Sequence, residues 1–111
     1  MIAEVFENIV LERQAKTRAK LLEKSKEYAD DQERLYNFKR AARMANGLEG
    51  LSSAGAAESL RGMLIKHWVS IEQIVAIYEA MGTVDERLLD EKLGDAVAYL
   101  HLLEAIIKER H

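Results

Sequence analysis

Helical spacing of apolar residues is the feature that most restricts the fold of this chain. Apolar side chains recur at intervals of three and four residues through most of the 111 positions, and no proline interrupts them. This period gathers them on one face of an α-helix, whereas a half-buried strand would alternate apolar and polar residues. The abundant Ala, Leu, Glu, Lys and Arg also favour helix. The sequence therefore predicts an all-α fold, a bundle of about four helices forming a single domain over residues 1–111.

The first expected helix is long and has two apolar ends joined by a polar middle. It runs from Ile2 to about Tyr28 without a glycine, and its stretch 13–20 is rich in Arg and Lys. Such a helix can extend beyond its own domain, so that its apolar 2–10 end packs on a second copy. A turn is expected at 29–31, because adjacent Asp residues suit the cap of a new helix.

A Ser- and Gly-rich loop separates the second and third expected helices. The second helix covers about 32–45 and stops at Gly47, a residue that favours the left-handed end of a helix. The loop spans 47–55, and Ser52 or Ser53 is expected to cap the third helix.

The third expected helix carries the clearest apolar stripe, and it ends at Gly82. Its predicted inner face consists of Leu60, Met63, Leu64, His67, Ile71, Ile74, Val75 and Tyr78. Thr83 and Glu86 have the spacing of a capping box, which predicts the start of the last helix. The short connection predicts that the third and fourth helices are antiparallel.

The composition excludes several classes of protein. The chain has no cysteine, which removes disulfides, thiolate chemistry and Cys-ligated zinc and fits a cytoplasmic location. Its start is acidic where a secretory signal would be basic, and no apolar run approaches the roughly 20 residues of a membrane span. We therefore expect a soluble cytoplasmic protein with no membrane partner.

Charge is unevenly distributed along the chain. Residues 11–43 hold ten Lys and Arg against six Asp and Glu, while the remaining positions hold six against thirteen. The two parts are therefore +4 and −7, an asymmetry that can orient an anionic ligand or drive contacts between copies. Solvated helix faces that differ by chance are the alternative. A positive excess of four is modest, so nucleic-acid binding is not expected.

Four polar residues share one flank of the last helix, at spacings of three and four: Glu91, Lys92, Asp95 and Tyr99. Two carboxylates four residues apart can hold Mg²⁺, which prefers oxygen ligands and can then engage phosphates. The alternative is a solvated flank with a local ion pair. Gly94 lies among them, and a glycine inside a helix suggests close approach of another helix or of a ligand.

Further candidate ligand contacts lie on the second and third helices. Arg34, Asn37 and Phe38 offer a guanidinium, an amide and a ring within one turn, a set suited to a phosphate and a base. Lys66 can meet a carboxylate of the last helix, a phosphate or solvent. His67 lies on the apolar stripe and is interpreted as a hydrogen-bonded core histidine rather than a metal ligand. Core packing and a solvated face account for the same residues.

Motifs of several enzyme classes are missing from the sequence. There is no glycine-rich phosphate loop, no His-Glu-x-x-His and no plausible Ser-His-Asp or Cys-His set. The P-loop, zincin and thiol-protease classes are therefore excluded.

The order of motifs from Lys24 onward resembles small all-helical proteins of bacteriophages and prophages. It is close to the nucleotide modification associated domain and, more distantly, to MazG-like nucleotide pyrophosphohydrolases. The likeness is carried by Lys24-Ser-Lys-Glu-Tyr28, Glu33-Arg34-Leu35-Tyr-Asn37-Phe38-Lys39, Gly62-Met63-Leu64-Ile-Lys66-His67 and Glu91-Lys92-Leu93-Gly94-Asp95-Ala-Val-Ala-Tyr99-Leu100.

The resemblance implies a protein that assembles as a dimer or tetramer and cuts nucleoside triphosphates with Mg²⁺. It makes Asp95 a metal ligand and Glu91 a weaker candidate. Lys92 stands where the MazG-like pattern has a Glu, and a Glu-x-x-Glu on the preceding helix is missing.

Two functions are therefore considered. The first is a phage-type protein that binds a nucleotide or related phosphate through Asp95, Glu91, Lys66, Tyr99 and the set of Arg34, Asn37 and Phe38. It includes a pyrophosphohydrolase-like activity as an extension. The alternative is a non-enzymatic homo-oligomeric or partner-binding structural protein.

Overall fold

The protein is all-helical, as its sequence predicts. The computed structural model describes residues 1–28, 33 and 35–109. Over these residues it has four helices and no strand: α1 (Ala3–Tyr28), α2 (Tyr36–Met44), α3 (Ala56–Met81) and α4 (Glu86–Glu109). None of the helices in this part of the chain is long and apolar enough to cross a membrane.

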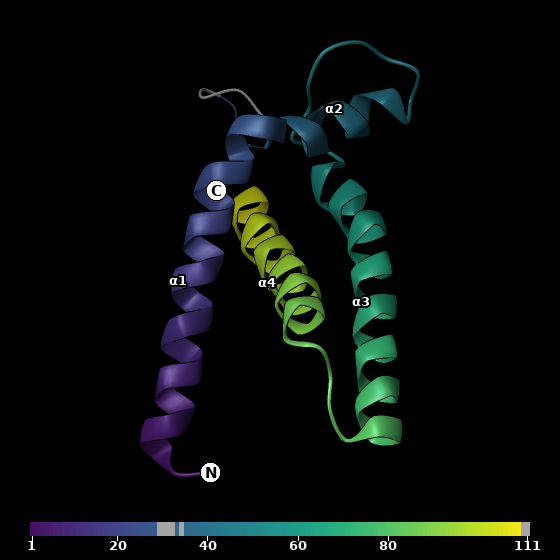
Figure 1. Ribbon diagram of the computed structural model, residues 1–111. Coiled ribbons are helices and arrows are strands. Elements are labelled where there is room, and N and C mark those ends of the chain that lie inside the picture. The colour runs from purple at the N-terminus through teal and green to yellow at the C-terminus, as the bar shows by residue number, and fades with distance from the viewer. Residues whose placement is uncertain (29–32, 34, 110–111) are drawn as a thin grey trace.

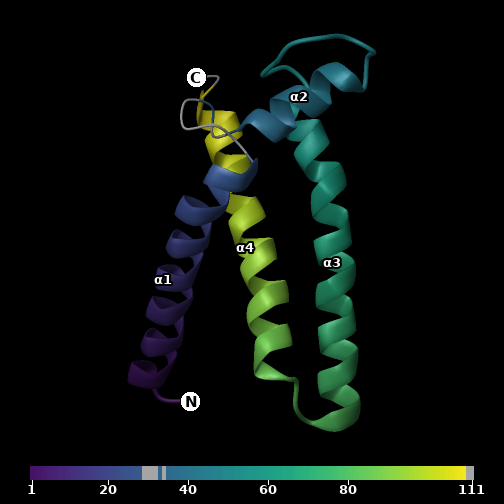
Figure 2. The same ribbon diagram turned by 45° about the horizontal axis from the view of Figure 1, so that its top comes forward.

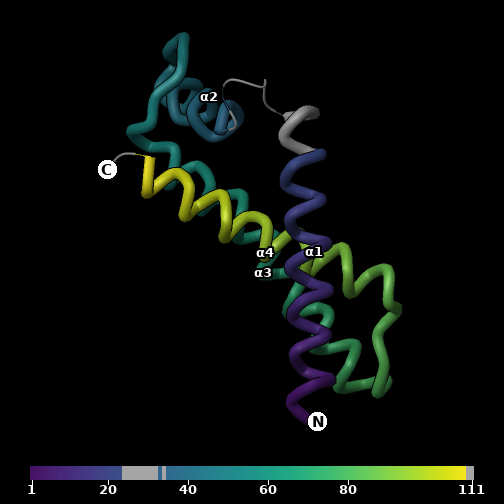
Figure 3. Tube along the Cα trace, turned by 90° about the vertical axis from the view of Figure 1, so that its left-hand side faces the viewer, coloured from purple at the N-terminus to yellow at the C-terminus, as the bar shows by residue number. Residues whose placement is uncertain are grey.

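The helix α4 lies between the two other long helices. Figures 1 and 2 show α1 on one side of α4 and α3 on the other, and α4 contacts both. The helices α3 and α4 run antiparallel, as their short connection predicts, whereas α1 crosses α4 obliquely (Figure 3). The short α2 packs on α3 near the start of that helix. The molecule is therefore an elongated array with α4 at its centre.

The main core lies where α2, α3 and the end of α4 meet. Its buried members are Leu35, Phe38, Ala56, Leu60, Leu64 and Ile106. Leu60 is completely buried, in keeping with its place on the predicted apolar stripe. Burial of such side chains contributes about 1.5–3 kcal/mol each before the entropy of ordering is counted. This contact fixes α2 against the α3–α4 pair.

A buried lysine ties α2 to the end of α4. Lys39 is buried, and its Nζ donates to Oε2 of Glu33 at 2.7 Å and to Oε1 of Glu109. The hydrogen bonds that Lys39 donates to Glu109 and Glu33 raise its pKa, against the opposing effect of burial. The ammonium group therefore stays charged while its aliphatic stem covers the core.

The caps of α3 and α4 differ from the sequence prediction. The residue before α3 is Gly55 with φ of 84°, and no side chain caps the helix, so neither Ser52 nor Ser53 is the N-cap. Ser52 instead accepts a hydrogen bond from the Ala54 N–H within the loop. A serine followed by small residues can close a local turn as readily as a helix start, and here the local turn forms.

The capping box predicted from Thr83 is replaced by a cap two residues later. Asp85 Oδ1 accepts from the N–H groups of Arg87 and Leu88, at 3.0 and 3.1 Å. An aspartate is as good an N-cap as a threonine, and it also carries a charge that favours the helix N-terminus. The predicted end of α3 is confirmed, because Gly82 has φ of 75°.

The boundaries of α2 are only partly described. The helix is seen from Tyr36, and it ends at Met44, slightly before the stop predicted at Gly47, whose φ is 68°. The predicted turn at 29–31 and the predicted helix start at 32 lie outside the described residues.

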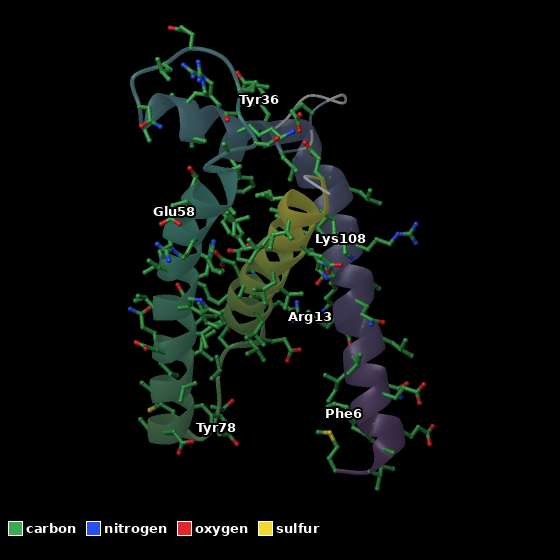
Figure 4. The ribbon with its side chains drawn as sticks, turned by 180° about the vertical axis from the view of Figure 1, so that it is seen from behind. Phe6, Arg13, Tyr36, Glu58, Tyr78 and Lys108 are labelled. Atoms are coloured by element: carbon green, nitrogen blue, oxygen red, sulfur yellow. The ribbon has the colours of Figure 1, made fainter. Side chains whose placement is uncertain are left out.

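The helices α1 and α3 both extend past the start of α4. Figure 4 shows Phe6 of α1 and Tyr78 of α3 at the same end of the molecule. The inward position predicted for Val75 and Tyr78 is wrong, since each is 55% exposed. Their spacing fits the apolar stripe, but α4 begins only at Glu86 and does not reach them. The spacing of apolar residues predicts which face of α3 is apolar. It does not predict how much of that face α4 buries.

Two glycine substitutions test the backbone assignments. Gly62 lies exposed within α3 with nothing within 4 Å of an added Cβ, so Gly62→Ala is expected to raise the free energy of unfolding by about 1 kcal/mol. Gly82→Ala is expected to lower it by about 1 kcal/mol, because its φ of 75° is strained for a residue with a Cβ. Urea unfolding measures both, and equal effects of the same sign would contradict the assignment.

Candidate functional site

Arg13 and Lys16 of α1 share one carboxylate of α4. Arg13 Nη2 lies 2.6 Å from Asp90 Oδ1, and Lys16 Nζ lies 2.9 Å from Oδ2. The hydrogen bonds from Lys16 and then from Arg13 hold the pKa of Asp90 below its ordinary value. The positive excess of the 11–43 segment is thus partly compensated within the chain itself.

A second ion pair joins the same two helices one turn further along. Lys20 Nζ donates to Asp95 Oδ1, and both side chains are about one fifth exposed. Gly94 lies beneath this contact, where an added Cβ would be 3.4 Å from Arg13 Nη1 and 3.6 Å from Lys20 Nζ. Close approach of another helix, one of the two reasons proposed for Gly94, is therefore found, and that helix is α1.

Three rings form a row from α2 through α4 to α3. The ring of Tyr99 meets Phe38 edge-on, with centroids 5.9 Å apart, and meets His67 at 4.5 Å. His67 is 8% exposed, and its Nε2 finds no hydrogen-bond partner among the residues that the structure describes. His67 is thus buried, as its position on the stripe predicts, but one of its two nitrogens is left unsatisfied. A buried polar atom without a partner costs about 1–3 kcal/mol.

Charges around His67 come from all three long helices. Burial is the main cause that lowers the pKa of His67, and Asp95 raises it, while Lys66, Lys20 and Lys92 lower it further. The imidazole is therefore neutral at neutral pH. Asp95 has the largest charge effect on this ring, and the three ammonium groups oppose it. Lys66 and Asp95 both act on His67, but the partner of Asp95 in the structure is Lys20.

The predicted contacts on α2 have different positions. Asn37 is exposed on the first turn of α2. Phe38 is 6% exposed and belongs to the core, where its ring packs on Tyr99. The structure therefore places Phe38 in the core, the alternative to a base contact that its spacing also allows. Arg34 lies outside the described residues.

The carboxylates predicted to hold Mg²⁺ each have a lysine beside them. Asp95 accepts from Lys20, and exposed Glu91 lies 3.7 Å from the Nζ of Lys92. Among the described residues no group of three His, Cys, Asp or Glu could hold a metal ion. This donor set fits a divalent cation poorly, because a cation there would have to displace ammonium groups.

The α1–α4 ion pairs were not predicted from the sequence. Spacing alone shows Arg13, Lys16 and Lys20 as a polar middle of the first helix and gives no partner for Asp90. A signal was present, since the basic residues 13, 16 and 20 lie at helical spacing and the last helix carries carboxylates at 90 and 95. A basic face on one helix and carboxylates on another can be recognised in a sequence. Which two helices pack together cannot. Thr17 lies on the same part of α1 and is buried, and its Oγ1 finds no hydrogen-bond partner in the described part of the chain.

Comparison with protein-family models found no match, and comparisons with curated proteins and with solved structures found none either. The resemblance noted in the sequence therefore stays a prediction.

The ion pair across Gly94 is expected to hold α1 against α4. Asp95→Asn should lower the free energy of unfolding by about 1.5 kcal/mol, because Lys20 would lose a charge-assisted hydrogen bond at a partly shielded site. Hydrogen exchange should accelerate mainly at amides of α1. Glu104→Gln is the control, since the Glu104–Lys108 pair is exposed and should contribute little. Equal protection of α1 in the two variants would contradict this role.

Burial of His67 predicts a loss of stability in mild acid. Its pKa lies below its ordinary value of 6.5, so the unfolded chain takes up a proton first as the pH falls. The free energy of unfolding should therefore fall as the pH drops below about 6.5 and level off once the folded protein is also protonated. Asp90 adds a separate loss at lower pH, near and below 3.8. Urea unfolding at about pH 7.5 and 5.5 measures the first effect, since histidine is the side chain that titrates there. His67→Gln should remove most of it, and an unchanged pH dependence would refute the assignment.

Proposed function

We propose that this protein binds a nucleotide or a related phosphate at the surface of α3 and α4 around His67. The observation that carries the proposal is a buried imidazole whose Nε2 has no partner in the described structure and whose pKa is lowered by burial and by nearby Lys66 and Lys92. Buried polar atoms in folded proteins are nearly always hydrogen-bonded, so an orphan nitrogen beside cations suggests a missing anionic acceptor.

Lys66 and Lys92 supply the charge for this site. Lys20 is engaged by Asp95, whereas exposed Lys66 has no ion pair within the described part of the chain. Lys92 has a weak contact with Glu91 at 3.7 Å. A phosphate with about −1.5 to −2 charges would be stabilised by two such ammonium groups. It would also favour the protonated form of His67, whose Nε2 could then donate to a phosphate oxygen.

The rest of a nucleotide would extend toward α2. Tyr99 contacts both His67 and Phe38, and Asn37 is the exposed neighbour of Phe38 on α2. The amide of Asn37 can pair with the edge of a base, while Phe38 supports Tyr99 from within the core. Hydrolysis with Mg²⁺ at Asp95 and Glu91 is the extension that the resemblance implies. The binding proposal is built on the lysines and requires no metal.

Removal of one lysine charge tests the site. Inorganic phosphate and ADP, each with and without Mg²⁺, are titrated into the protein by calorimetry. Lys66→Gln should weaken binding about tenfold, the effect of losing one charge-assisted contact. Lys108→Gln is the matched control, because Lys108 is an exposed lysine of α4 paired with Glu104. The affinity of the Lys108→Gln variant for phosphate and ADP should equal that of the unmodified protein.

The pH dependence gives a second readout at the same site. Affinity should increase as the pH falls from about 7.5 to 6, because binding and protonation of His67 favour each other. Absence of binding at millimolar phosphate or ADP would contradict the proposal. An equal loss of affinity in Lys66→Gln and Lys108→Gln would also contradict it. So would binding that requires Mg²⁺ and depends on Asp95 but not on Lys66.

A further inference from the structure

The apolar end of α1 continues the face that docks on α4. Ile2, Val5, Phe6 and Ile9 are exposed, and they lie at spacings of three and four. The same spacing leads on to Arg13 and then to Lys20, whose side chains contact α4. The inner face of α1 is therefore covered along its second half and bare along residues 2–9, a length of about 12 Å.

The helix α3 has the same construction. Its inner face is buried at Leu60, Leu64, His67 and Ile74, and then continues to Tyr78 and Met81, which are exposed. Figures 1 and 4 show that α1 and α3 flank the same end of the molecule, beyond the start of α4. We call this the open end, made of residues 2–9 of α1 and 75–81 of α3. Two apolar helix faces thus lack the central helix that covers them elsewhere.

The accessible surface of the whole chain is larger than that of a compact monomer of the same mass. A monomeric protein of 12.6 kDa exposes about 6,200 Å² by the usual scaling with mass, whereas this chain exposes 8159 Å². Its radius of gyration is 16.4 Å, against about 13 Å for a compact domain of this length. The excess is about 2,000 Å² per chain, which over two chains falls within the 2,000–5,000 Å² of obligate homodimers.

We propose that a second copy of this chain covers the open end, with each copy placing its projecting α1 and α3 between those of the other. A two-fold axis lets the same surface serve both copies, so the contact is closed and covers the open end of both at once. The carboxylates of α1 point away from the contact, because helical spacing places Glu4 and Glu7 on the face of α1 opposite Phe6 and Ile9. The product is a four-helix contact of two α1 and two α3 helices.

Light scattering on the eluting full-length protein tests the partner. At micromolar concentration the unmodified chain should have a mass of about 25 kDa, twice the 12.6 kDa of one chain. Phe6→Asp should reduce the mass to that of one chain, because it places a charge in the contact. Leu11→Asp is the matched control: Leu11 is 54% exposed and Phe6 60%, but Leu11 lies on the opposite face of α1. The mass of this variant should stay at two chains.

A variant on the other helix separates dissociation from unfolding. Tyr78→Asp should also halve the mass, and circular dichroism should show that both variants keep their helices. A mass of one chain for the unmodified protein overturns the proposal, since the cover would then not be a second copy. A mass above two chains, or dissociation by Leu11→Asp but not by Phe6→Asp, overturns it as well. Phosphate binding at His67 does not depend on the outcome, because that site lies outside the open end.

Discussion

The packing of α1 against α4 is the contact on which the rest of this architecture depends. The basic side chains of α1 and the acidic side chains of α4 meet across Gly94, where the helices can approach closely. This contact covers the second half of α1 and leaves its first half beyond the start of α4. It also directs Lys20 toward Asp95, and so removes one carboxylate from the candidate site. The open end and the balance of charge near His67 therefore have a common origin.

The four helices follow from the sequence because apolar spacing and glycine positions are local signals. Gly82 illustrates this, since a left-handed residue after an apolar stripe ends a helix whatever the stripe packs against. Caps are less certain, because Thr83, Asp85, Ser52 and Ser53 all have the chemistry of a cap. Which of them is used depends on how the preceding loop reaches the helix. In this structure Asp85 caps α4, and Gly55 precedes α3 without a side-chain hydrogen bond from the described residues.

Tertiary partners account for what the sequence could not provide. Periodicity places Tyr78 on the same face as Leu60, yet one is exposed and the other is completely buried, because α4 covers only part of α3. Phe38 likewise has the spacing of a ligand contact and the position of a core residue. Gly94 is the part of the α4 cluster whose spacing predicts close approach of another helix or of a ligand, and α1 lies there. The partner helix itself could not be read from local spacing.

Zero-length cross-linking with isotope-mixed protein tests the docking of α1 on its own α4 most directly. Equal amounts of unlabelled and ¹⁵N-labelled chain are mixed and left until chains have exchanged between oligomers. They are then treated with a carbodiimide, which joins an amine to a carboxylate in contact with it. Lys16 Nζ lies 2.9 Å from Asp90 Oδ2, so mass spectrometry should find Lys16 joined to Asp90 with both peptides of the same isotope. Cross-linked peptides of mixed isotope, or no link between these residues, would contradict the account.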